Sequence, residues 1–174
     1  MSYSVKEIYF TLQGEGFHTG KHAVFCRFSG CNLWSGLEKN RENAICNFCD
    51  TDFVGTDGIN GDKYQNAESL AKKIDEIWDK NLNDKLVVFT GGEPLLQLNE
   101  ELIDLLHEKK FKVAIETNGT ILPPENIDWI CVSPKKGAEF NLNYGNEIKL
   151  VYPQKGLDPE EFKDFDFDHF LSLI

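Results

Sequence analysis

The chain of 174 residues contains no apolar run close to the roughly 18 residues that a membrane-spanning helix needs. Its first residues, MSYSVKEIYF, lack the basic segment followed by an apolar one that marks a secretory signal. We therefore expect a cytoplasmic protein. No internal repeat or low-complexity segment interrupts residues 1–174, and this length suits one domain with a core of its own.

Basic residues are fewer than acidic ones. The chain has 18 Lys and Arg against 29 Asp and Glu, which gives a net charge of −11. Because affinity for nucleic acids is largely electrostatic, this balance argues against a broad phosphate-binding surface. We expect neither a nucleic-acid partner nor a membrane partner. A local basic pocket for a small anion is still compatible with this composition.

Cysteines are present, but their number is odd. Five cysteines cannot all form intramolecular disulfides, and in a cytosolic chain they more often bind metal or take part in catalysis. Cys31, Cys46 and Cys49 lie in residues 30–66, a long segment rich in Gly, Asn and Asp, and the last two are spaced as C-x2-C. A loop of this length in a compact domain is usually functional.

Two kinds of metal site are compatible with this spacing. A zinc site with four thiolates could use Cys26 together with the three loop cysteines. However, Cys26 and Cys131 both lie in apolar, strand-like segments, and free cysteines are among the most often buried residues. Three loop thiolates alone would leave one position open, and in a 4Fe-4S cluster that leaves one iron free to bind another molecule.

The rest of the chain alternates between strand-like and helix-like patterns. We expect strands at residues 22–29, 85–90, 111–117, 128–133, 147–151 and 169–174, and helices at residues 67–80, 95–110 and 158–165. Such alternation predicts a parallel sheet with right-handed crossovers, and six strands are too few for a closed eight-stranded barrel. The predicted fold is therefore an α/β open, partial parallel barrel of about six strands and roughly three helices, with the cysteine loop after its first strand.

Polar motifs follow several of these strands, at the edge where parallel sheets bind ligands. They are TGGEP (90–94), ETNG (116–119) and SPK (133–135). The two glycines let a backbone approach a ligand closely. Arg27 should face the side opposite to Cys26, where it needs an anionic partner. That partner is either the carboxylate of a substrate or an acid of the chain itself.

The cysteine loop and the GGEP motif together resemble the radical S-adenosylmethionine (SAM) enzymes, in which a reduced cluster cleaves SAM to a radical. The usual spacing there is C-x3-C-x2-C, whereas the first gap here is fourteen residues. LQGEG (12–16), FCRFSGCNL and FCDT narrow the resemblance to the 7-carboxy-7-deazaguanine synthase family, over residues 5 to about 152. That family converts 6-carboxytetrahydropterin to a 7-deazapurine with loss of ammonia, on the route to queuosine and related compounds.

The resemblance implies a 4Fe-4S cluster, SAM and Mg²⁺ as cofactors. It assigns the cluster to Cys31, Cys46 and Cys49, and Mg²⁺ to Thr51. The SAM-binding residues that it implies are Phe48, Asp50, Gly91, Gly92, Glu93, Ser133, Lys135, Glu116 and Asn118. For Glu116 and Asn118 the implied contact is with the SAM ribose or with substrate, and a strand end followed by a simple Asn-Gly turn explains them equally well. The implied substrate-binding residues are Leu12, Gln13, Gly14, Glu15, Arg27 and Thr90. No side chain is expected to act alone in catalysis, because the cofactor carries the difficult step.

The resemblance implies a flavodoxin- or ferredoxin-like reductant and a homodimer. Family members usually continue beyond the last strand, so we expect the pocket-forming tail to be shortened here. The rival interpretations are another radical SAM enzyme, such as a glycyl-radical activase, and a non-enzymatic zinc or iron–sulfur module.

Overall fold

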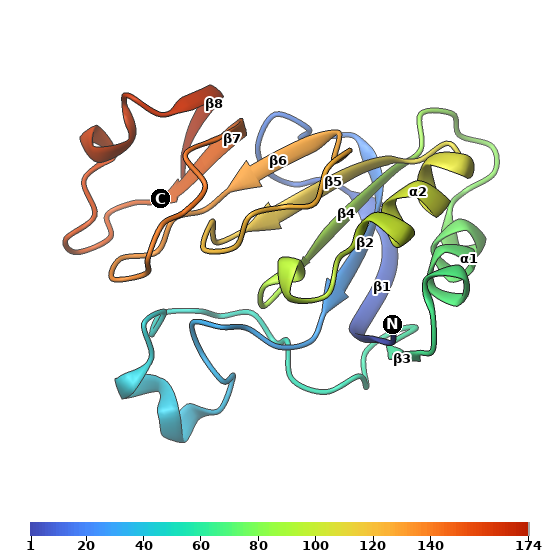
Figure 1. Ribbon diagram of the computed structural model, residues 1–174, viewed down its shortest axis with the longest axis horizontal. Coiled ribbons are helices and arrows are strands. Elements are labelled where there is room, and N and C mark those ends of the chain that lie inside the picture. The colour runs from blue at the N-terminus through green and yellow to red at the C-terminus, as the bar shows by residue number, and fades with distance from the viewer. Residues whose placement is uncertain (174) are drawn as a thin grey trace.

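A single eight-stranded sheet organises the chain, with helices packed over one of its faces (Figure 1). The computed structural model describes residues 1–173. The strands are β1 (Tyr3–Leu12), β2 (His22–Phe28), β3 (Asp62–Tyr64), β4 (Leu86–Gly91), β5 (Lys112–Thr117), β6 (Trp129–Val132), β7 (Tyr144–Val151) and β8 (Asp166–Leu173). The helices are α1 (Ala67–Ile77) and α2 (Glu100–Glu108), with shorter 3-10 helices η1 (Glu38–Asn43), η2 (Pro94–Leu96) and η3 (Pro159–Phe162).

The strand order is β3-β1-β2-β4-β5-β6-β7-β8. All pairs from β2 to β8 are parallel, so the expected open parallel sheet of six strands is confirmed. Residue 174, which was expected to end the last strand, lies outside the described residues. The structure adds β1 and β3, which pair antiparallel at the other edge. The alternation in β1 is broken by a register shift between Val5 and Glu7, and for that reason its pattern did not predict a strand.

Local capping explains where the helices begin. Asn66 accepts a hydrogen bond from the backbone of Ser69, and the Ser69 side chain completes a capping box. The helix expected over 95–110 is instead interrupted. Its first residues form η2, and α2 begins only after Asn99, whose side chain accepts from the backbone of Leu102. The third expected helix is the short η3.

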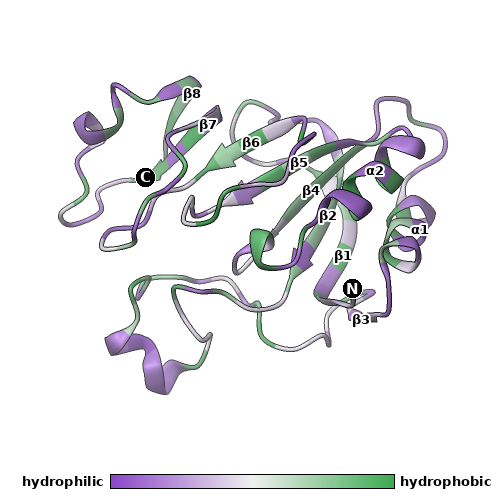
Figure 2. Ribbon diagram, viewed as in Figure 1, coloured by the Kyte–Doolittle hydropathy of each residue, from purple (hydrophilic) through white to green (hydrophobic). Residues whose placement is uncertain are grey.

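The main core lies between the sheet and the two α-helices. In Figure 2 the central strands β4 and β6 are mainly apolar, whereas α1 and α2 contain both apolar and polar residues. Val24, Cys26 and Phe28 point into this core from β2, and all three are fully buried. The expected core position of Cys26 is therefore confirmed.

The opposite face of the sheet is only partly apolar. A small cluster of Ala23, Leu86, Val88 and Ala114 lies near the amino ends of the strands. Polar side chains follow on the same face toward the carboxyl ends. This uncovered, polar end of the sheet is where the candidate site lies.

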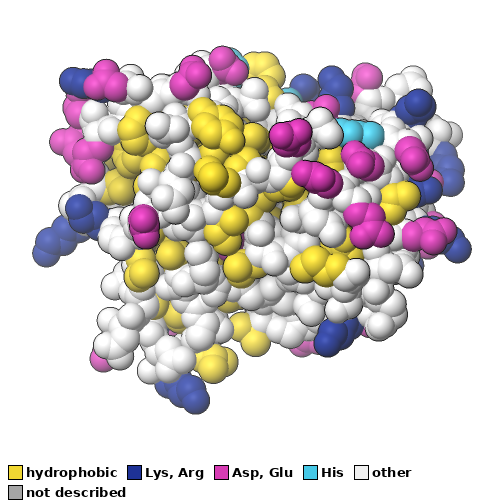
Figure 3. All heavy atoms as spheres, viewed as in Figure 1, with side chains coloured by type: hydrophobic (Ala, Val, Ile, Leu, Met, Phe, Trp, Pro, Cys, Tyr) yellow, Lys and Arg dark blue, Asp and Glu magenta, His cyan; other side chains and the backbone are white. Residues whose placement is uncertain are grey.

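The surface agrees with the acidic composition. Acidic and basic side chains are interspersed on the face shown in Figure 3, without a continuous basic area. Within residues 1–173, no helix combines the length and the apolar character that crossing a membrane would require.

Replacing Leu102 tests the packing of α2. This side chain is fully buried in the main core, so Leu102→Ala should lower the free energy of unfolding by about 2–5 kcal/mol. Asp104→Ala, on the exposed side of the same helix, should change it by no more than about 0.5 kcal/mol. Urea unfolding curves measure both, and equal losses in the two variants would contradict this placement of the core.

Candidate active site at the carboxyl ends of the strands

Three free cysteines approach one another in the loop that follows β2. The thiols of Cys46 and Cys49 share a hydrogen bond, and Cys31 lies close enough to interact electrostatically with both. The hydrogen bond with Cys46 is the main cause that lowers the pKa of Cys49 to about 6. Hydrogen bonds from the backbone and side chain of Thr51 lower it further. The backbone N–H of Leu33 donates to Cys31 Sγ at 3.4 Å.

This donor set is compatible with a cluster. Among residues 1–173, no three Cys, His, Asp or Glu side chains converge on one ion position. The thiolates of a cubane cluster need no such convergence, because they bind separate irons. Cys26 cannot join the loop cysteines, since its side chain is buried in the core between sheet and helices. The expected alternative of a four-thiolate zinc site is therefore wrong.

The Gly-Gly turn after β4 packs directly against the cysteine loop. A Cβ atom on Gly92 would overlap the carbonyl oxygen of Gly30 and lie 2.7 Å from Cys31 Cβ. The backbone N–H of Glu93 donates to Gly30 O at 3.0 Å. Only glycine fits between these groups, so this turn sets the position of Cys31.

Glu93 is fully buried, and both of its carboxylate oxygens carry hydrogen bonds. Oε1 accepts from the backbone of Leu95 at 3.0 Å and from Thr117 Oγ1 at 2.8 Å. Oε2 accepts from the backbone of Asn118 at 2.8 Å. Burial raises the pKa of Glu93, while these three donors oppose the rise. The carboxylate thus joins the turn after β4 to the end of β5.

The ETNG motif divides between two parts of the site. Asn118 donates from Nδ2 to Asn32 Oδ1 at 2.9 Å, and Asn32 donates to Thr120 Oγ1 at 2.7 Å, so this asparagine holds the cysteine loop. Glu116 points instead toward the pocket on the uncovered face of the sheet.

The SPK motif lies beside the cysteine loop. Lys135 Nζ donates to the carbonyl and hydroxyl oxygens of Ser133, both at 2.6 Å. Burial lowers the pKa of Lys135, and electrostatic interactions with Cys46 and Cys49 oppose that shift. The tip of the loop is open, because Phe48 and Asp50 are both exposed.

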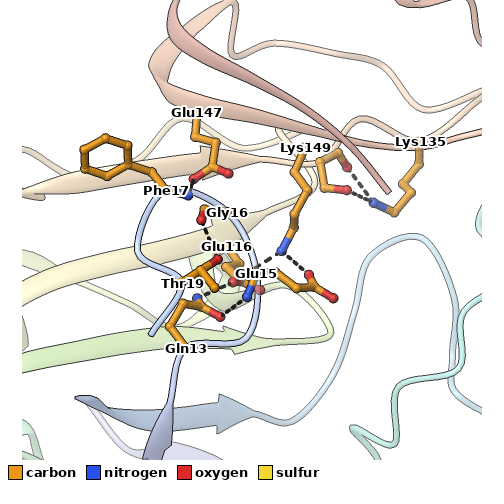
Figure 4. A network of polar contacts seen from close by, with 10 residues as sticks. Gln13, Glu15, Gly16, Phe17, Thr19, Glu116, Lys135, Glu147 and Lys149 are labelled. Carbon is orange, nitrogen blue, oxygen red and sulfur yellow. Dashed lines mark hydrogen bonds and ion pairs between the residues drawn. The ribbon is translucent and has the colours of Figure 1, made fainter. Parts of the chain in front are cut away.

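Lys149 is the centre of the polar network on the substrate side (Figure 4). Its Nζ lies 3.1 Å from Glu15 Oε2 and 3.3 Å from Glu116 Oε1. Gln13 Nε2 donates to the same oxygen of Glu116 at 3.1 Å. Lys149 and Glu147 were not among the residues predicted from the sequence. The alternation in EIKLV, which places both on one face of β7, could have identified them.

Glu147 holds the LQGEG loop against β7. The backbone N–H of Phe17 donates to Glu147 Oε2 at 3.3 Å. Gly16 has a positive φ of 73°, and a Cβ there would overlap the Glu147 carboxylate. The loop therefore closes over the pocket, with Gln13 buried while Leu12 and Gly14 are exposed.

Arg27 faces the side opposite to Cys26, as expected. Its Nε donates to Glu7 Oε1 at 2.9 Å, so one of its two expected partners, an acid of the chain, is present. Thr90 is buried and is the register partner of Arg27 on β4. Both residues thus lie on the uncovered face with Glu116.

The pocket enclosed by this network is small, about 10 Å³. Cys131 is buried as expected, but it lines this pocket rather than the main core. His18 and Trp129 line it too, and they also line a cleft of about 890 Å³ at the amino ends of the strands. These two rings therefore separate the pocket from the cleft.

Comparison with known proteins agrees with this architecture. A model of the radical SAM superfamily matches residues 40–165. The 7-carboxy-7-deazaguanine synthases of Caulobacter vibrioides and Bradyrhizobium diazoefficiens are 58% and 56% identical over 170 residues, which are 98% of this chain and 81% of each relative. The crystal structure of QueE from Escherichia coli gives a TM-score of 0.65 at 28% identity, covering 87% of this chain and 71% of that chain. The chain belongs to the radical SAM superfamily and, within it, to the 7-carboxy-7-deazaguanine synthase family.

The His18 ring, one of the two rings that separate the pocket from the cleft, makes the free energy of unfolding depend on pH. His18 Nδ1 is buried without a hydrogen-bond partner among the described residues, and the ring lies 4.4 Å from Trp129 between centroids. Burial, together with Lys21 and Lys112, lowers the pKa of His18 to about 4. The unfolded side chain titrates near 6.5, so between these values the unfolded chain binds more protons. This contribution to stability is present above about pH 6.5 and is lost toward pH 4.

His18→Phe keeps an aromatic ring against Trp129 and removes the titration. Its free energy of unfolding should fall less steeply than that of the wild type as the pH drops from about 7 to 5. Urea midpoints at several pH values measure this difference. Parallel profiles for the two proteins would contradict the low pKa of His18.

Proposed function

We propose that this chain converts 6-carboxytetrahydropterin to 7-carboxy-7-deazaguanine with loss of ammonia, using a 4Fe-4S cluster, SAM and Mg²⁺. The observation that carries the proposal is the meeting of three free loop cysteines with the Gly-Gly turn at the carboxyl edge of the sheet. The similarity to curated 7-carboxy-7-deazaguanine synthases over 98% of the chain supports it.

In this function Cys31, Cys46 and Cys49 hold the cluster. With SAM bound, the cluster supplies the one-electron chemistry that starts the reaction. The chain's own part is to orient the thiolates and stabilise their charge. The N–H of Leu33 does so at Cys31, and Thr51 does so at Cys49.

The cofactor side of the site would bind SAM. Because the Glu93 oxygens already hold structural hydrogen bonds, we assign contacts with the SAM ammonium to the backbone of Gly91 and Gly92, with Glu93 fixing that turn. Ser133 and Lys135 offer a hydroxyl and an ammonium group to the anionic part of SAM. The remaining residues proposed for SAM are Phe48, Asp50, Glu116 and Asn118.

The polar pocket would bind the pterin. Gln13, Glu15 and Glu116 offer amide and carboxylate groups that complement its amide and amino edge. Leu12 and Gly14 would contribute through their backbone, and Thr90 through its hydroxyl. The pocket measures only about 10 Å³, whereas ligand sites typically measure about 300–1,000 Å³. We therefore infer that the LQGEG loop moves away from β7 when the pterin binds.

The ionic groups of the substrate need their own partners. Arg27 would exchange Glu7 for the substrate carboxylate, which a guanidinium binds in bidentate geometry. Thr51 would contribute one hydroxyl ligand to Mg²⁺, with substrate oxygens and water completing the shell.

The enzyme acts on a small molecule. It also needs an electron donor that reduces the cluster. We infer a flavodoxin- or ferredoxin-like reductant and a homodimeric assembly, as the family resemblance implies. The five free cysteines favour a reducing compartment, the cytoplasm.

Anaerobic turnover tests the proposed function. Reconstituted protein, given 6-carboxytetrahydropterin, SAM, Mg²⁺ and a reductant, should form 5′-deoxyadenosine and 7-carboxy-7-deazaguanine, followed by mass spectrometry. The turnover rate should fall more than about 100-fold in each of three variants, Cys31→Ala, Cys46→Ala and Cys49→Ala. This loss is larger than the roughly 10–100-fold loss typical when a group that only orients a metal ligand is removed.

Cys26→Ala is the matched control, because its thiol lies in the main core and not in the cysteine loop. This variant should retain its iron. SAM cleavage without any deazapurine would refute the proposed substrate while leaving the superfamily chemistry intact.

A further inference from the structure

The fourteen residues between Cys31 and Cys46 form a closed loop of their own. The backbone N–H of Cys46 donates to Leu33 O at 3.4 Å, and this contact returns the chain to the start of the loop. Between them lies η1, in the light-blue lobe that projects beyond the end of β2 in Figure 1. Apart from the N–H of Leu33 that donates to Cys31, no role assigned above to cofactor or substrate involves this insertion, residues 32–45.

One side chain of the insertion contacts the backbone of the C-x2-C turn. Arg41 Nη1 donates to Asn47 O at 3.0 Å and to Cys49 O at 2.9 Å. These carbonyls belong to the turn that carries Cys46 and Cys49. A single nitrogen therefore fixes two peptide groups of that turn.

The guanidinium is itself held from two other directions. Its Nε and Nη2 donate to the two carboxylate oxygens of Glu38, at 2.7 and 2.5 Å. Its central carbon lies 4.1 Å from the ring centre of Trp34. Trp34 is only 7% exposed and meets Phe53 edge-on, so this platform is anchored in the protein. Four of the five guanidinium donors are used, in a fixed planar geometry that lysine cannot reproduce.

We propose that Arg41 is a positioning residue for the cluster, and that the insertion braces the C-x2-C turn in its ligand-binding conformation. This inference rests on the proposed function, which assigns Cys46 and Cys49 as ligands. The contacts of Arg41 are all made with other groups of the protein, so they do not themselves require iron. Its positive charge also lies close enough to interact with both thiolates. Groups outside the ligand shell that orient ligands typically change metal affinity by about 10–100-fold.

The test compares four reconstituted proteins under anaerobic conditions: the wild type, Arg41→Gln, Arg41→Lys and Lys39→Gln. Lys39 is exposed two residues from Arg41 and makes no ion pair within residues 1–173, so it controls for the loss of one charge. Arg41→Gln should release iron to a chelator about tenfold faster than the wild type, and Lys39→Gln at the wild-type rate. Arg41→Lys should behave more like Arg41→Gln, because an ammonium group cannot bridge both carbonyls and Glu38.

A second readout uses metal-free protein. Amide hydrogen exchange over residues 46–51 should be faster in Arg41→Gln than in the wild type, with exchange in the sheet unchanged. If Arg41→Gln fails to fold, Glu38→Gln keeps the backbone contacts of Arg41 and weakens only its support. It should then accelerate iron release by about two- to threefold, a smaller effect than loss of the arginine.

Iron release from Arg41→Gln within about twofold of the wild type would overturn the inference. A lower unfolding midpoint combined with unchanged iron release would overturn it too, because it would assign Arg41 to stability alone. A wild-type chain that takes up no iron would overturn the proposed function as well, so the two failures are distinguishable.

Discussion

The carboxylate of Glu93 is the interaction on which the site depends. A carboxyl group buried without partners would be strongly destabilising, and this one is tolerated because three donors converge on it. They join the turn after β4 to the end of β5. The same turn meets Cys31 through Gly92, and the end of β5 meets the cysteine loop through Asn118. These contacts hold the ends of the strands and the cysteine loop together.

Parallel topology brings two chemically different halves to the same edge of the sheet. One half contains thiols and backbone groups for a cofactor, and the other is a charged pocket around Lys149. Each ionic group of the pocket already has a partner within the protein, including Arg27 with Glu7. A substrate must replace these partners with groups of matching charge, and that exchange selects against molecules that lack them.

Local patterns predicted much of this structure, and long-range contacts account for the rest. Apolar, strand-like segments predicted the six parallel strands. The position of Cys26 in one of these segments separated it from the loop cysteines. The register shift in β1 and the cap at Asn99 changed the elements that periodicity had predicted. Glu93 as a clamp and Arg41 as a brace depend on partners that only the folded chain brings close, so no local pattern could have assigned them.

The most direct test of the three-thiolate cluster is spectroscopy of the reduced, reconstituted chain with and without SAM. If three thiolates hold the cluster, the chain should contain about four irons, and its electron paramagnetic resonance spectrum should change when SAM binds the iron without a thiolate ligand. Bound zinc in place of iron, or a spectrum unaffected by SAM, would contradict it.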